Sequence, residues 1–118
     1  MSLSIETRRL LACYCRDKRS RQIAWNLGAR WDARLIENPE TGMPYGDAAA
    51  WVLAADSLED MSVTVHELTL EKPRGAKAYY WLVPQLGRAS IYIKIQIAPG
   101  GSCVLGRSFH IAAFEERL

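Results

Sequence analysis

The segment from Ile91 to Ile97 constrains the fold more than any other, because isoleucine alternates strictly with other side chains along it. A period of two places the isoleucines on one side of a β-strand and three polar residues on the other: Tyr92, Lys94 and Gln96. Pro99-Gly100-Gly101 then predicts a turn, and Ser102 to Ile111 predicts a returning strand. The sequence therefore predicts a hairpin with one buried and one polar face.

Helical periodicity dominates the first half of the chain. It predicts helices over Ile5–Arg16 and Ser20–Ala33, and a third helix that begins at an Asp47 cap and runs to about Asp60. The third helix is expected to bury four side chains: Trp51, Val52, Ala55 and Leu58. Alternating residues over 63–70 and 77–84 predict two further strands before the hairpin.

Because no helix separates the predicted strands, they are expected to form an antiparallel meander. We therefore expect an α+β fold, with two to three N-terminal helices packed on one face of a four-stranded antiparallel sheet. The 118 residues fit one domain, 1–118, which is mainly helical over 1–60 and an antiparallel meander over 61–112.

The register of the last hairpin decides which residues share the polar face. A loop from Ala98 to Ser102 pairs Ile95 with Leu105 and Ile93 with Arg107, which places Arg107 awkwardly on the core face. The opposite face then carries a phenol, an ammonium, an amide and an imidazole together with a small residue: Tyr92, Lys94, Gln96, His110 and Gly106.

The net charge of +2 conceals an uneven distribution along the chain. Residues 1–36 carry eight Lys/Arg and three Asp/Glu, residues 37–72 carry one and eight, and residues 73–118 carry six and two. Ordinary solvated surface is one interpretation of this pattern. The other is that the two basic segments share a face that meets phosphate, with an N-terminal contribution from Arg16, Lys18 and Arg19.

The polar face of the hairpin holds the groups needed to cleave RNA through attack by its own 2′-hydroxyl. His110 can act as base or acid, since an imidazole changes charge near neutral pH. Lys94 can hold the phosphate, Tyr92 can orient it or relay a proton, and Gly106 leaves space for a substrate. Arg107 joins them only if a bulge at Gly106 turns it outward. This chemistry needs no metal or cofactor; the alternative is an ordinary solvated sheet face.

Ile91-Tyr92-Ile93-Lys94-Ile95, followed by a turn and a closing Ser108-Phe109-His110, resembles the C-terminal hairpin of MqsR-like toxins. These are small endoribonucleases of the RelE/barnase-like superfamily, made together with a neutralising antitoxin. The resemblance implies active-site roles for Tyr92 and His110, with Lys94 as their neighbour. It also implies helices followed by an antiparallel sheet, and makes Lys77 a stand-in for a lysine that the family uses upstream.

Partners and location follow from these features. RNA and an antitoxin protein are the expected partners, and Lys77, Gln96 and Arg107 are candidate RNA contacts beside the catalytic group. No apolar run approaches the ~20 residues of a membrane span. The odd number of cysteines, with Cys13 and Cys15 too close for an easy bridge, predicts a reduced, cytoplasmic protein. The alternative function is a non-catalytic RNA- or protein-binding module of phage or mobile-element origin.

Overall fold

The computed structural model describes residues 3–71 and 74–112, so the ends of the expected domain 1–118 and the pair 72–73 lie outside the described residues. Two helices and six strands follow one another along this part of the chain. Their bounds are α1 Ile5–Arg16, β1 Arg21–Ile23, β2 Arg30–Trp31, α2 Asp47–Glu59, β3 His66–Thr69, β4 Lys77–Gln85, β5 Arg88–Ile97 and β6 Val104–Ile111.

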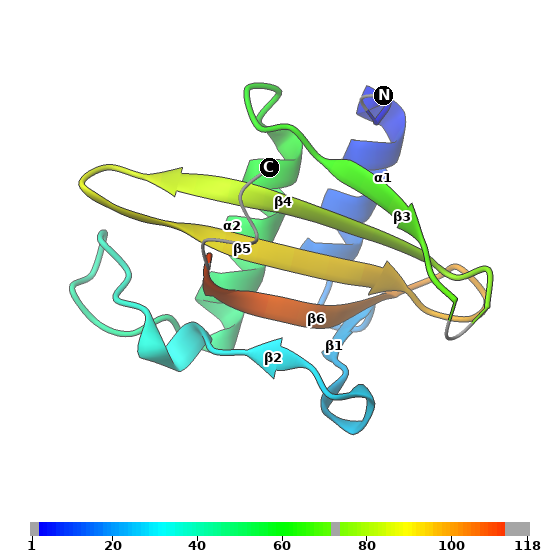
Figure 1. Ribbon diagram of the computed structural model, residues 1–118, viewed down its shortest axis with the longest axis horizontal. Coiled ribbons are helices and arrows are strands. Elements are labelled where there is room, and N and C mark those ends of the chain that lie inside the picture. Colours follow the sequence, from blue (N-terminus) through cyan, green and yellow to red (C-terminus); the bar gives the residue numbers. More distant parts are fainter. Residues whose placement is uncertain (1–2, 72–73, 113–118) are drawn as a thin grey trace.

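The strands form one mixed sheet in the order β1-β6-β5-β4-β3, with β2 also paired to β6. Strands β3 to β6 are antiparallel neighbours, as expected, whereas β1 and β2 run parallel to β6. Both helices cover one face of this sheet and leave its other face toward the viewer in Figure 1. The α+β class is confirmed, but the expectation of four antiparallel strands is wrong. Neither helix in the described ranges has the length and apolar character of a membrane span.

The expected helix over Ser20–Ala33 does not form. Instead β1, a 3₁₀ turn at Trp25–Leu27, β2 and a second 3₁₀ turn at Ala33–Leu35 occupy this segment. Gly28 ends the first turn in the left-handed conformation, at φ 79°, which interrupts a helix. Ile23, Leu27 and Trp31 recur every four residues, which is the spacing of one helical stripe. In the structure, however, Ile23 and Trp31 belong to strands β1 and β2 and lie on the helix-covered face beside β6.

The register of the β5–β6 hairpin differs from the expected one and changes along its length. Ile95 lies opposite Gly106 and Lys94 lies opposite Ser108, so Arg107 is an extra residue in a β-bulge. Before the bulge, Val104 and Gly106 face the helices; after it, Phe109 does. Leu105 and Arg107 therefore leave the expected core face.

Aromatic rings fill the space between the sheet and α2. The ring of Trp31 lies 4.8 Å from that of Trp51 and 5.2 Å from that of Phe109, and Tyr45 packs edge-on against Phe109. Trp51, Ala55 and Leu58 are buried as expected, but Val52 is 46% exposed. Asp47 is the first residue of α2, and the cap position belongs to Gly46.

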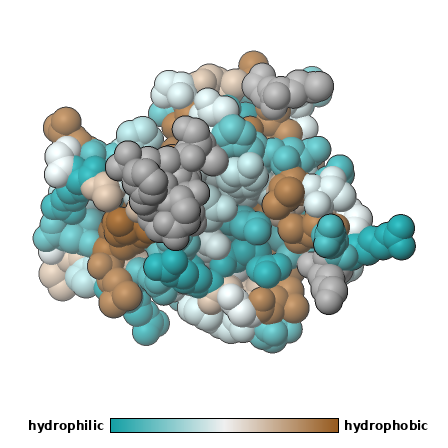
Figure 2. Space-filling model, in the orientation of Figure 1, coloured by the Kyte–Doolittle hydropathy of each residue, from teal (hydrophilic) through white to brown (hydrophobic). Residues whose placement is uncertain are grey.

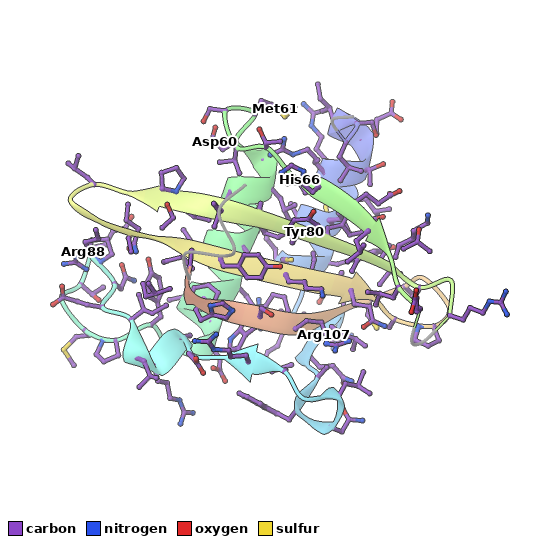
Figure 3. All side chains as sticks on the ribbon, in the orientation of Figure 1. Asp60, Met61, His66, Tyr80, Arg88 and Arg107 are labelled. Atoms are coloured by element: carbon purple, nitrogen blue, oxygen red, sulfur yellow. The ribbon has the colours of Figure 1, made fainter. Side chains whose placement is uncertain are left out.

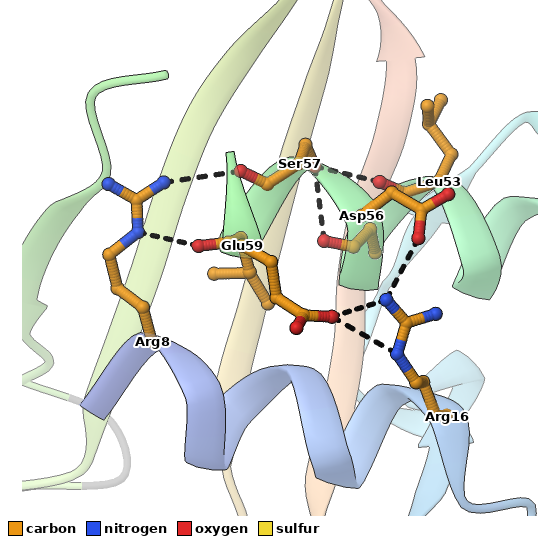
Figure 4. Close-up of polar contacts among 8 residues, drawn as sticks. Arg8, Arg16, Leu53, Asp56, Ser57 and Glu59 are labelled. Carbon is orange, nitrogen blue, oxygen red and sulfur yellow. Dashed lines mark hydrogen bonds and ion pairs between the residues drawn. The ribbon is translucent and has the colours of Figure 1, made fainter. Parts of the chain in front are cut away.

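Two arginines of α1 join the helices, as Figure 4 shows. The buried Arg8 side chain donates hydrogen bonds to the carbonyl oxygens of Leu58 (2.7 Å), Ser57 (3.2 Å) and Asp60 (2.8 Å) at the C-terminal end of α2. Ser57 O also accepts from the Asp60 N–H and Asp60 O from the Val63 N–H, so Leu58 O depends most on Arg8. A positive charge at this end of α2 also favours the helix dipole. Arg16 pairs with Asp56 and Glu59 at the surface.

We expect Arg8→Ala to lower the free energy of unfolding by roughly 2–3 kcal/mol, because it removes three hydrogen bonds and leaves the buried carbonyl oxygen of Leu58 without the Arg8 donor. Urea denaturation followed by circular dichroism measures this loss. Arg9→Ala is the matched control, since Arg9 is exposed on the same helix, and should change the free energy by less than about 0.5 kcal/mol. Equal losses in the two variants would contradict the role given to Arg8.

Candidate functional site

Tyr92 and His110 lie directly opposite each other on the sheet face that the helices leave uncovered. Their ring centroids are 5.3 Å apart and the ring planes differ by 25°. Tyr92 is half-buried, whereas His110 keeps 4% of its surface exposed. The structure thus brings together the two residues expected to share a face, with little of the imidazole open to solvent.

The tautomer of His110 follows from its neighbour. Its Nδ1 lies 2.9 Å from the carbonyl oxygen of Ile111. A carbonyl oxygen only accepts hydrogen bonds, so Nδ1 carries the proton and Nε2 of a neutral ring is left as the acceptor. His110 therefore holds the basic nitrogen that a proton-abstracting group needs.

Lys94 and Arg107 add two positive charges to this face of the sheet. Lys94 is half-buried on β5, and the bulge in β6 turns Arg107 onto the same face. Burial, and then the positive charge of Arg107, lower the pKa of Lys94. Within residues 3–71 and 74–112, neither cation has a carboxylate at ion-pair distance. Two uncompensated cations on neighbouring strands form an electrostatic site for an anion.

Gln96 is fully buried, so it does not present its amide to a ligand as expected. Its Oε1 instead accepts a hydrogen bond of 2.6 Å from Arg107 Nη1, and the carbonyl oxygen of Leu27 accepts one of 3.3 Å from Nη2. Gln96 Nε2 and Arg107 Nε are buried without a partner in the described part of the protein. Gln96 therefore fixes the guanidinium of Arg107 rather than contacting RNA.

Gly106 does not open the floor of the site, because it faces the helices. A Cβ atom there would lie 2.7 Å from Cζ3 of Trp31 and 3.1 Å from Cη2 of Trp51. Lys77 also belongs to the helix-side alternation of β4, and its Nζ donates to Thr69 Oγ1 at 2.8 Å with Glu67 3.7 Å away. Neither Gly106 nor Lys77 lies on the sheet face that carries Tyr92.

The N-terminal basic residues do not join the site either. Arg16 lies in the helix layer and is paired with two carboxylates of α2 (Figure 4). Lys18 and Arg19 are exposed in the turn that leads into β1, whose first residue lies opposite Val104. Val104 is the start of β6 and His110 is near its end, roughly 20 Å away at ~3.3 Å per residue. Lys18 and Arg19 therefore lead into the opposite end of β6 from His110.

Two further rings extend the site across the sheet. Tyr80 of β4 lies opposite Lys94, and its ring centroid is 6.2 Å from that of Tyr92. His66 of β3 lies opposite Tyr80, with the rings 5.1 Å apart, and both are labelled on the front of the sheet in Figure 3. The alternation of Tyr80 with Tyr79 is the signal that could have assigned Tyr80 to this face.

Hydrophilic side chains gather over the middle of this face, with apolar patches to either side (Figure 2). In the described ranges, no three His, Cys, Asp or Glu side chains are grouped to hold a metal ion. The chain matches no protein-family model, no curated protein and no solved structure. The resemblance to MqsR-like toxins therefore rests on the residues of the hairpin alone.

We expect Gly106→Ala to destabilise the protein by roughly 1–3 kcal/mol, because the new methyl group overpacks the two tryptophans. Thermal and urea unfolding measure the effect. Gly46→Ala is the control: its added Cβ meets no atom within 4 Å, and the substitution should cost less than about 1 kcal/mol. A stable Gly106→Ala protein that loses RNA binding would instead place Gly106 in the substrate site.

Proposed function

We propose that this protein is a metal-independent endoribonuclease that acts in the cytoplasm, with its active site at Tyr92, Lys94 and His110. The observation that carries the proposal is the placement of Lys94 next to Tyr92 on one face of β5, with Arg107 close to Lys94. Neither cation has a carboxylate at ion-pair distance within residues 3–71 and 74–112. The cations suit a phosphate, and the ring pair suits proton transfer at its oxygens.

In the proposed reaction, His110 Nε2 takes the proton of the 2′-hydroxyl while the 2′-oxygen bonds to phosphorus. The bond from phosphorus to the 5′-oxygen breaks, and that oxygen takes a proton from the Tyr92 hydroxyl. The imidazolium then returns a proton to Tyr92. Lys94 and Arg107 stabilise the charge that develops on the phosphate oxygens. The products are a 2′,3′-cyclic phosphate and a 5′-hydroxyl, and substrate binding must give the RNA access to the His110 ring, of which 4% is exposed.

The resemblance of the hairpin to MqsR-like toxins supports a toxin of a toxin–antitoxin pair, whose antitoxin would neutralise this site. A non-catalytic RNA-binding module is the second candidate. The burial of His110 favours this second candidate, because binding through Lys94 and Arg107 does not need an accessible imidazole.

We expect His110→Ala to lower the rate of RNA cleavage about a hundredfold or more while RNA affinity persists, since the imidazole supplies proton transfer. Tyr92→Phe keeps the ring and loses the hydroxyl, so its rate should fall less. Cleavage of end-labelled RNA in a chelator, with mass analysis for the cyclic phosphate, measures both. If the wild-type protein binds RNA but does not cleave it, the result contradicts the nuclease and supports the non-catalytic RNA-binding module.

The lowered pKa of Lys94 predicts how RNA affinity depends on pH. Phosphate binds the protonated amine, so affinity should fall as pH rises through the pKa of Lys94, starting at a lower pH than for an ordinary lysine. Lys94→Arg stays protonated and should move this fall to higher pH. Titration with 2′-O-methyl RNA, which cannot be cleaved, measures the difference; identical profiles would remove Lys94 from the phosphate site.

A further inference from the structure

Four rings cross the uncovered sheet face, one from each of four successive strands. His66, Tyr80, Tyr92 and His110 are separated by 5.1, 6.2 and 5.3 Å between consecutive centroids. Tyr80 is also the direct cross-strand neighbour of Lys94, so the row passes the cation site. His66, Tyr80 and Tyr92 keep part of their surface exposed. The row therefore runs from the proposed phosphate site toward β3, an edge strand of the sheet.

The ligand that fits this row has flat aromatic groups joined by negative charges. Nucleic-acid bases stack on aromatic side chains, and single strands are bound where such rings accompany cations. Tyr80 and His66 are stacked on each other with centroids 5.1 Å apart, which is less than the roughly 7 Å that a base inserted between two rings needs at ~3.4 Å per stacked layer. Each ring of this pair therefore suits one base on its outer face. Duplex bases are paired and stacked on one another and are not available to side chains in this way.

The charge around the row is complementary to the same ligand. The sequence holds no acidic residue between Pro73 and Phe114, which includes β4, β5 and β6. On β3, Glu67 lies opposite Tyr79 and faces the helix side, where it is 3.7 Å from Lys77. The carboxylates Asp56 and Glu59 belong to α2, behind the sheet.

We infer that Tyr80 and His66 form a base-stacking track, and that the protein binds a single strand of RNA running across β5, β4 and β3. The phosphate next to Tyr92 lies at Lys94 and Arg107, and the bases that follow it stack on Tyr80 and then on His66. This inference rests on the proposed function for its ligand, and it adds two binding residues that take no part in the proton transfers.

The test uses a short fluorescent 2′-O-methyl RNA, alone and annealed to its complement, with fluorescence anisotropy as the readout. The wild-type protein should bind the single strand more tightly than the duplex. Tyr80→Leu should weaken single-strand binding about tenfold, because stacking on the ring is lost, and Tyr80→Phe should restore it. Tyr14→Leu is the matched control, since Tyr14 is a half-buried tyrosine of α1 that bonds to Gly101, and its affinity should equal wild type.

Salt dependence separates stacking from charge. The slope of log affinity against log salt should stay unchanged in Tyr80→Leu and decrease in Lys94→Ala, which loses a phosphate contact. Unchanged affinity in a folded Tyr80→Leu protein, or equal binding of duplex and single strand, would overturn the track. Cleavage of unmodified RNA is measured separately. If RNA binding depends on Tyr80 but the RNA is not cleaved, the proposed nuclease activity is wrong. If RNA is cleaved and Tyr80→Leu changes neither binding nor cleavage, the base-stacking track is wrong.

Discussion

The bulge at Arg107 in β6 determines which residues can form a site. Strict alternation from Gly106 would place His110 under the helices and Phe109 on the uncovered face. The extra residue reverses the alternation, so Phe109 enters the aromatic core and His110 lies beside Tyr92. The same residue projects Arg107 outward, where Gln96 holds it. One irregularity of the backbone thus produces both the core contact and the candidate site.

The packing around Gly106 holds this strand in place. Because Gly106 has no side chain, Trp31 and Trp51 approach the backbone of β6 from β2 and α2. The parallel strands β1 and β2 pair with the side of β6 that β5 does not occupy, so β6 is hydrogen-bonded along both sides. A strand fixed on both sides and from the helix layer is a rigid support for His110, as precise functional geometry requires.

Period-two alternation was sufficient to predict the faces of β5 and the two antiparallel hairpin strands. It placed His110 on the face of Tyr92 only through a register without the bulge, which the structure does not have. Helical spacing likewise located α1 at Ile5–Arg16 and most of α2. The sequence leaves a bulge at Gly106 as the condition for an outward Arg107, and the structure meets that condition. Alternation alone does not establish the bulge, because it depends on Phe109 finding space among distant rings. The helix predicted over Ser20–Ala33 is wrong for a similar reason. The spacing of Ile23 and Trp31 fits a helix, but pairing with β6 decides their conformation.

The distribution of charged residues along the sequence did not predict which cations share a surface in the folded protein. Three of the N-terminal arginines serve the fold: Arg8 binds the end of α2, Arg16 pairs with its carboxylates, and Arg21 donates to the carbonyl oxygen of Cys15 and lies over Trp51. Lys94 and Arg107 lie instead on the sheet face opposite the helices, where the charge of Arg107 lowers the pKa of Lys94. Neither has a carboxylate at ion-pair distance in the described part of the chain. Their mutual repulsion costs free energy unless an anion lies between them. A functional anion is therefore better indicated by two uncompensated cations than by a basic segment.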